Sequence, residues 1–129
     1  MTGRYASVPM LYIRIGVALS LLACQGVSNA VDCQKLSDLA SRDGIFVPRD
    51  DAGRTVIGKG RLQFYSAPDY SCVMRGVFVI KGQTVNAYTE YRKFTSVVYL
   101  SDKREKPIVG WVRTNRLTPN GIGVAPAQK

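Results

Sequence analysis

The side chains that most enzymes use for nucleophilic and metal chemistry are largely missing from this sequence. The chain of 129 residues contains no histidine, which rules out Ser-His-Asp and Cys-His nucleophile sites and HExxH zinc sites. Its nine carboxylates are scattered among basic residues, with no pair spaced for acid–base catalysis. The three cysteines alone cannot fill a structural zinc site. We therefore expect a protein that is not an enzyme and that needs neither a metal ion nor a cofactor.

Two of the cysteines have a simpler use than metal binding. Cys33 and Cys72 form an even pair in a chain that we interpret as exported, and such a pair is typical of a disulfide. For a loop of this length, the chain-entropy model gives a stabilisation of about 4 kcal/mol. Two unpaired buried thiols are the alternative, which export disfavours.

The first thirty residues have the pattern of a targeting segment for export. An uncharged apolar run over residues 15–23 follows Arg4 and Arg14, and it is too short to cross a bilayer core, which takes about 20 helical residues. A basic start, a short apolar run and small residues after it are typical of a secretory signal peptide, which we assign to residues 1–30. A buried N-terminal helix is the alternative, although no polar face interrupts the run.

Two processing sites compete at the end of this segment. Ser28-Asn29-Ala30 has small residues at the positions that signal peptidase reads, so cleavage before Val31 predicts a periplasmic protein. Leu21-Leu22-Ala23-Cys24 resembles a lipobox, in which Cys24 is lipidated and the product is an outer-membrane lipoprotein. A membrane therefore enters the prediction only through that lipid anchor.

Tyrosine is the first feature of a binding surface. The chain contains more tyrosines than one small core needs, and tyrosines at strand ends and loop rims are common interface anchors. Tyr88 and Tyr99 fit half-buried strand positions. That leaves Tyr65, Tyr70 and Tyr91 as candidate partner contacts.

Positive charge is the second feature. Arg92 and Lys93 lie in one expected hairpin tip, Lys103 and Arg104 lie in another, and we expect the fold to bring the two tips near one another. The chain has a formal charge of +9, which favours an anionic partner through electrostatic steering. Wall peptide carboxylates, anionic lipid headgroups and acidic proteins all qualify, while an ordinary solvated pair of tips is the alternative. Nucleic acid fits the charge but not an exported chain.

The elements that must position these residues divide at about residue 60. Residues 32–44 read as a short helix with Asp32 as its cap, an apolar face that includes Cys33, and Gly44 after its end. Extended segments then complete a lead-in over residues 31–59. From Gly60 to Leu117 the pattern is β, with breakers between five short β-branched or aromatic runs. These runs are 62–65, 77–80, 84–88, 94–100 and 108–112.

Five short strands are too few for two packed sheets, so a small, partly open barrel over residues 60–118 is the expected fold, followed by a flexible tail over 119–129. Phe64, Phe94 and Trp111 are the expected core, with Trp111 plugging the barrel. Gly82 falls at a hairpin where a positive φ favours glycine.

Four motifs in this region resemble bacterial SH3-like (SH3b) domains in their order and spacing. The segments LQFYSAP (62–68) and IKGQTV (80–85) resemble the family's opening strand and its "kGdkV" hairpin. FTSVVY (94–99) resembles its "gWykV" strand, and GWV (110–112) followed by Arg116-Leu117 resembles its closing "GWV…yL". The likeness covers a little under half of the chain. Phe94 stands where the family usually has tryptophan, and Tyr65 where many members have arginine.

The resemblance implies a five-stranded SH3-like barrel that binds cell-wall peptide or other proteins. We therefore expect a non-catalytic binding module of the cell envelope, whose ligand is a protein partner or peptidoglycan. Because this short chain has no room for an attached hydrolase, an immunity protein that neutralises a periplasm-acting toxin of a secretion system is the alternative.

Overall fold

The protein is described here by a computed structural model that covers residue 3 and residues 30–124. The expected signal segment, its lipobox with Cys24, and the last five residues of the expected tail lie outside these residues. Within them, no helix is long and apolar enough to cross a membrane.

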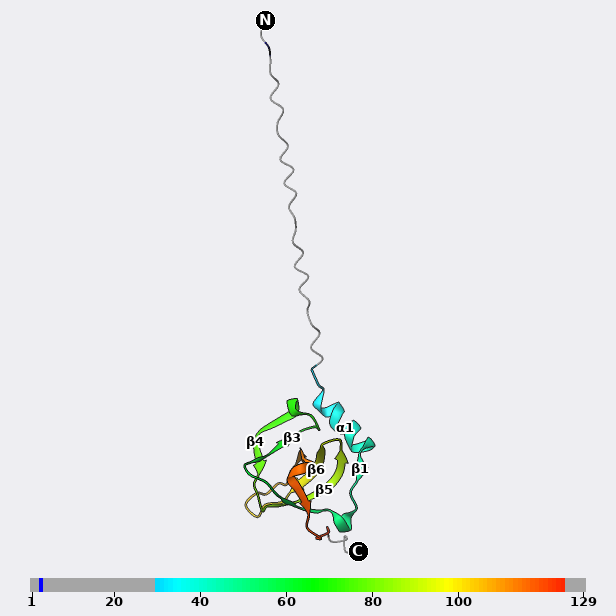
Figure 1. Ribbon diagram of the computed structural model, residues 1–129, viewed down its shortest axis with the longest axis vertical. Helices are drawn as coiled ribbons and strands as arrows, with labels where there is room; N and C mark the ends of the chain where they lie inside the picture. Colours follow the sequence, from blue (N-terminus) through cyan, green and yellow to red (C-terminus); the bar gives the residue numbers. More distant parts are fainter. Residues whose placement is uncertain (1–2, 4–29, 125–129) are drawn as a thin grey trace.

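The described chain is mainly β, with one α-helix and one antiparallel sheet (Figure 1). The strands are β1 (Ile45–Phe46), β2 (Gly53–Val56), β3 (Leu62–Tyr65), β4 (Val73–Val79), β5 (Thr84–Tyr91), β6 (Phe94–Tyr99), β7 (Ile108–Arg113) and β8 (Leu117–Pro119). They lie in the order β4-β3-β7-β6-β5-β2-β8, and β1 also pairs with β5. All five expected runs are strands, which confirms the mainly β prediction.

Three further strands were not expected as part of the sheet. The lead-in supplies β1 and β2, and β2 pairs with both β5 and β8. Beyond β8, the Gly53 amide donates to the Ile122 carbonyl at 2.7 Å, and the Val124 amide donates to the Arg49 carbonyl at 2.8 Å. Residues 119–124 are therefore hydrogen-bonded along β2 and the short 3₁₀ helix η1 (Arg49–Asp51), which differs from the free tail that we expected.

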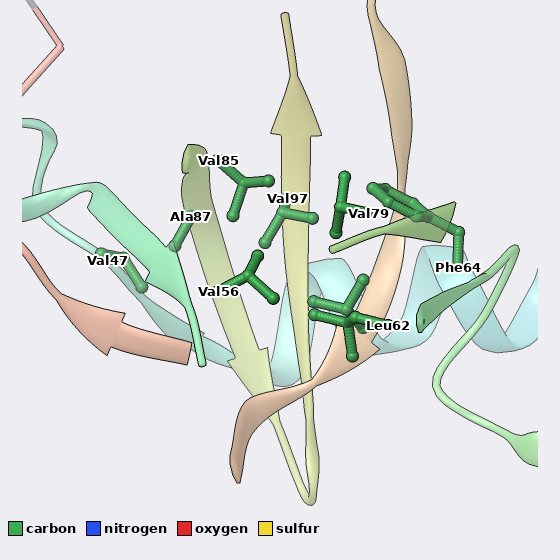
Figure 2. Close-up of a cluster of buried hydrophobic side chains, with 9 residues drawn as sticks. Val47, Val56, Leu62, Phe64, Val79, Val85, Ala87 and Val97 are labelled. Carbon is green, nitrogen blue, oxygen red and sulfur yellow. The ribbon is translucent and has the colours of Figure 1, made fainter. Parts of the chain in front are cut away.

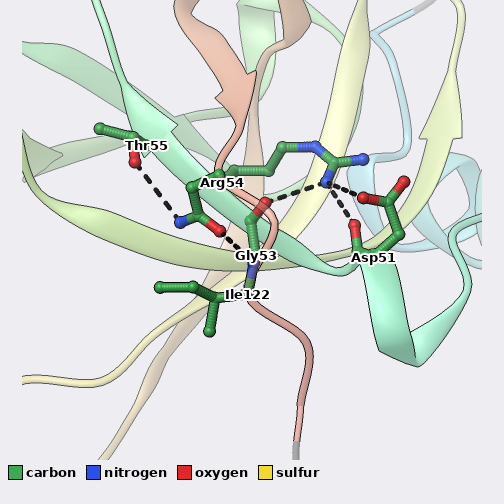
Figure 3. A network of polar contacts seen from close by, with 6 residues as sticks. Asp51, Gly53, Arg54, Thr55 and Ile122 are labelled. Carbon is green, nitrogen blue, oxygen red and sulfur yellow. Dashed lines mark hydrogen bonds and ion pairs between the residues drawn. The ribbon is translucent and has the colours of Figure 1, made fainter.

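A buried arginine of β2, Arg54, makes polar contacts with the residues just before it in the chain (Figure 3). Arg54 is only 7% exposed. Its guanidinium donates to the carbonyls of Asp51 and Gly53 and lies 4.0 Å from the Asp51 carboxylate. These contacts satisfy a charge that would be costly to bury alone.

One face of the sheet encloses the main core (Figure 2). Its residues come from the strands β2 to β7 and from the segment after β1, and Leu117 of β8 packs against it. Because β4 and β8 are not paired although their neighbours share this core, the sheet is open but curls over on itself. The core consists of Val47, Val56, Leu62, Phe64, Val79, Val85, Ala87, Val97 and Val112.

The other face carries a second, aromatic cluster of Ala40, Phe94 and Trp111 beneath the helix. Side chains alternate along a strand, so Val112 enters the main core while Trp111 points to the opposite face. The Trp111 Nε1 donates to Ser37 Oγ of the helix at 3.2 Å. Phe64, Phe94 and Trp111 are all buried, but the prediction that Trp111 plugs the barrel is wrong: it fastens the helix to the outside of the sheet.

The helix α1 (Cys33–Asp43) follows its local signals. The Asp32 carboxylate accepts from the Lys35 amide at 3.1 Å, as an N-cap does. Gly44 ends the helix with a φ of −73°, so it is not needed for a left-handed turn. It is needed for space, because a Cβ there would lie 2.6 Å from the Ala40 carbonyl oxygen and 2.7 Å from that of Glu90.

The expected disulfide between Cys33 and Cys72 is present, with a Cα–Cα distance of 5.8 Å. It joins the first residue of α1 to the last residue of the 3₁₀ helix η2 (Tyr70–Cys72). Since it links positions 39 residues apart, the bridge holds the helix and the loop before β4 on the same side of the sheet.

Candidate functional site

An aromatic and basic groove lies on the side of the molecule where η2, the β5–β6 turn and the end of β7 meet. It consists of two adjacent hollows that share Tyr70 and Lys93. The larger hollow, of about 460 Å³, is completed by Arg113, Thr114 and Asn115. The smaller one, of about 210 Å³, is completed by Pro68, Asp69, Arg92 and Phe94. We call the two together the Tyr70 groove.

Tyr70 is the exposed end of an aromatic stack. Its ring centroid lies 5.2 Å from that of Phe94 and 5.7 Å from that of Tyr65, with edge-to-face geometry in both pairs. Tyr65 and Phe94 are also in edge contact, at 5.4 Å. Tyr70 remains 58% exposed. Its ring is held by Phe94 and Tyr65 beneath it and can still contact a partner with its free face and its hydroxyl.

The β5–β6 turn brings Arg92 and Lys93 to this ring. Tyr91 and Phe94 are paired partners, so only these two residues make the turn. Arg92 has a φ of +53° and is the only described residue other than glycine with a positive φ. A two-residue turn with a positive φ at its first position normally takes glycine there, and another residue costs about 1 kcal/mol or more. The guanidinium of Arg92 lies 5.2 Å from the Tyr91 ring centre.

Residues at the end of β7 fix this turn in place. The Thr114 amide donates to the Lys93 carbonyl at 2.9 Å, and the Thr114 hydroxyl lies 2.7 Å from that of the fully buried Thr95. Arg113 is paired directly with Phe94 across the ladder. Arg113 and the 3₁₀ helix η3 (Thr114–Arg116) therefore stand beside Lys93 as part of the sheet framework.

A single carboxylate stands on the other rim. Asp69 caps η2: its Oδ1 accepts from the Ser71 amide at 2.9 Å and from the Ser71 hydroxyl. These two hydrogen bonds lower the pKa of Asp69 below its ordinary value, so the group is ionised at neutral pH.

The cations of the groove are not neutralised by the protein itself. Within residues 30–124, the one ion pair joins Arg54 and Asp51, on another part of the sheet. Arg92, Lys93 and Arg113 therefore have no ion-pair partner in the described structure. Three unpaired positive charges around an exposed tyrosine make a site suited to an anionic group.

The second basic tip lies elsewhere. Arg92 and Lys93 precede β6, whereas Lys103 and Arg104 follow it in the loop to β7. The six residues of β6 separate the two tips by about 20 Å. The expectation that the two tips lie together is wrong, because consecutive hairpin turns fall at opposite ends of the strand they share. Lys103 lines a separate, polar hollow with Gln83 and Tyr99.

Of the expected contacts, the structure gathers Tyr65, Tyr70, Arg92 and Lys93 at one site, and Tyr91 packs against the aromatic cluster below it. Sequence reasoning missed Asp69, Arg113 and Asn115. Asp69 preceding Tyr70 and Ser71 was a visible capping signal. Nothing local marked Arg113 or Asn115, because the register of β6 against β7 decides their place.

The described residues contain no group of three or more histidine, cysteine or acidic side chains that could hold a metal ion. All of the polar side-chain atoms that are buried in this part of the chain have a hydrogen-bond partner. The groove offers a ligand positive charge, hydrogen-bonding side chains and an aromatic face.

The class that the fold and this groove define is a mainly β domain with a charged aromatic contact surface. Comparison with known proteins adds no narrower identity: no protein-family model, no curated protein and no solved structure matches the chain.

Proposed function

We propose that this protein is a non-catalytic binding module of the SH3-like (SH3b) kind, exported to the periplasm, that binds an anionic partner through the Tyr70 groove. The partner is a protein or the peptide part of peptidoglycan. The observation that carries the proposal is the set of three unpaired cations, Arg92, Lys93 and Arg113, around the exposed ring of Tyr70.

The curled, open sheet supports the SH3-like part of the proposal. The five expected runs are neighbours in the order β4-β3-β7-β6-β5 and all contribute to one core, and a partly open barrel is the finer description that we propose for this arrangement. The helix, its disulfide and the strands β1, β2 and β8 are then additions to that barrel.

The disulfide supports the proposed location. Such bridges persist in oxidising compartments, of which the bacterial periplasm is one. The bridge ends in η2 beside Tyr70, so an oxidising compartment would also keep the groove in shape.

Affinity capture tests the proposal. The purified, oxidised protein is immobilised and exposed to a solubilised envelope fraction, and in parallel it is sedimented with purified peptidoglycan. We expect retention of an acidic protein or pelleting with the wall, weakened as salt rises because the groove acts through charge. Salt-insensitive retention, or none in either arm, would contradict the proposal.

A second candidate, the immunity protein, is favoured by the composition of the groove. Tyrosine and arginine are, with tryptophan, the residues enriched in the energetic centres of protein–protein interfaces, and the groove carries Tyr70 between Arg92 and Arg113. Such a centre can block the acidic cleft of a toxin. The capture experiment separates the candidates, since an immunity protein retains one enzyme, inhibits it, and leaves peptidoglycan in the supernatant.

A further inference from the structure

We infer that the Tyr70 groove recognises a short acidic–apolar element, with one carboxylate in the larger hollow and an apolar side chain in the smaller, and that Asp69 excludes a second carboxylate. This inference rests on the proposed function and names the ligand chemistry of the same site.

The larger hollow is built for one anion. Lys93 and Arg113 line it, Asn115 adds an amide, and no carboxylate is among its lining residues. Arg113 is held by its place in β7, and Lys93 by the hydrogen bond from the Thr114 amide to its carbonyl. A guanidinium and an ammonium form charge-assisted hydrogen bonds to a carboxylate, and because their backbone is already fixed, only the two side chains have to be ordered.

The smaller hollow differs in size and in the charge of its lining. Pro68, the Phe94 ring and the Tyr70 ring give it an apolar lining, and Asp69 stands at its rim opposite Arg92 and Lys93. An apolar side chain can pack there against the rings. A carboxylate in the same place meets the Asp69 charge as well as those of Arg92 and Lys93, so it gains less than a carboxylate in the larger hollow, where no like charge opposes it.

The two hollows meet at Tyr70 and Lys93, so a ligand that fills both must present its two groups close together. Asp69 then acts as a specificity-determining residue: it adds no attraction to the correct ligand and penalises the wrong one. A polyanion, which satisfies the cations equally well, is disfavoured in the same way.

The test uses two blocked peptides as probes, acetyl-Leu-Ala-Asp-amide and acetyl-Asp-Ala-Asp-amide, with acetyl-Asp-Ala-Leu-amide to cover the reverse direction. Each is titrated into the oxidised protein at low ionic strength and followed by amide chemical shifts. We expect shifts at Lys93, Arg113 and Asn115, and a roughly threefold preference for the better singly acidic peptide over the doubly acidic one, which is the size of an exposed charge–charge effect.

The variant Asp69→Asn removes the charge and keeps the cap, because asparagine accepts the same bond from the Ser71 amide. We expect it to abolish the preference. Asp102→Asn, with the same change of charge in the loop after β6, is the matched control and should retain it.

Three results would overturn the inference. These are an unchanged preference in Asp69→Asn, tighter binding of the doubly acidic peptide by the unaltered protein, and no shift at the groove with any peptide. The last result leaves the proposed function standing if the envelope capture still succeeds and depends on Arg92 and Lys93. Failure of that capture contradicts the function itself.

Discussion

The two basic turns at the ends of β6 have similar composition, but the first is short and tied to the sheet while the second is long and tied only to itself. The turn before β6 holds Arg92 and Lys93 in two residues, with a positive φ at Arg92 and a hydrogen bond from Thr114 to Lys93. The loop after β6 is longer, over residues 100–107, and contains Lys103 and Arg104. Its backbone hydrogen bond, from the Arg104 amide to the Ser101 carbonyl, lies within the loop itself. The first turn stands against the exposed ring of Tyr70 and the buried ring of Phe94, whereas Lys103 of the second loop shares a polar hollow with Tyr99.

The difference shows that charge alone does not make a site. A lysine or arginine on a loop tied only to itself loses side-chain and backbone freedom on binding, which offsets most of the contact. A cation on a tight, tethered turn has already lost the backbone part of that freedom, and only its side chain remains to be ordered. Arg92 also has a positive φ, a conformation that glycine adopts more easily.

The largest expected effect comes from opening the disulfide, which braces only the first of these two regions. We expect the double variant Cys33→Ser/Cys72→Ser to lose up to about 4 kcal/mol of unfolding free energy, measured by urea denaturation. Hydrogen exchange should rise around η2 and Tyr70 but not in residues 100–107, because Cys72 belongs to η2. Equal loosening of both regions would show that the bridge does not brace the groove.

Charge reversal compares the two turns directly. We expect Arg92→Glu/Lys93→Glu to weaken binding of the captured partner by roughly 100-fold, as loss of an interface centre does. The matched pair Lys103→Glu/Arg104→Glu makes the same change in net charge, and we expect only a few-fold slower association at low salt. Surface plasmon resonance at two salt concentrations separates the two effects. Equal losses from both pairs would mean that general charge, not the groove, drives binding.

Relieving the strain sharpens the comparison further. We expect Arg92→Gly to raise the unfolding free energy by about 1 kcal/mol, because glycine adopts a positive φ without a clash, and to weaken partner binding at the same time. Gly82 has a φ of +89° in the β4–β5 turn and serves as the converse control. Gly82→Ala should destabilise by about 1 kcal/mol and leave binding intact.

The smallest expected effect is on pH dependence. The chain has no histidine, the side chain whose ordinary pKa lies between about pH 5 and 8. The hydrogen bonds from Ser71 lower the pKa of Asp69, so this carboxylate keeps its charge throughout that range. A lowered native pKa gives stability that is complete above the unfolded value and is lost as pH falls through the native one. Binding of the singly acidic peptide and its preference over the doubly acidic one should therefore be constant from about pH 5 to 8, with stability falling only in more acidic solution. A midpoint near neutral pH would contradict this.

Much of the fold was predictable because its signals are local. The strands β3 to β7 are β-branched and aromatic runs between breakers, and α1 begins after a capping aspartate and ends at Gly44. The disulfide followed from two cysteines and an inferred compartment. The lead-in that supplies β1 and β2 was predicted to be extended, but nothing in the short segments of β1, β2 and β8 shows which strands they pair with.

The candidate site was predictable in part. Tyr70 was predicted because the chain has more tyrosines than one small core needs. Arg92 and Lys93 were predicted because they are adjacent basic residues in an expected hairpin turn. The grouping was not found: Lys103 and Arg104 were placed with them, and Arg113 was left out. Both errors concern distance between residues that are not neighbours in sequence.

By itself, then, the sequence determined that this chain builds a β domain without catalytic histidine, capped by a short helix and fastened by one bridge. These are consequences of side-chain type and short-range periodicity. The tertiary structure decided that Trp111 lies under the helix and not inside the sheet, and that the two basic turns lie apart. Pairing register and strand order decide which residues meet, and each depends on contacts between segments that no local pattern records.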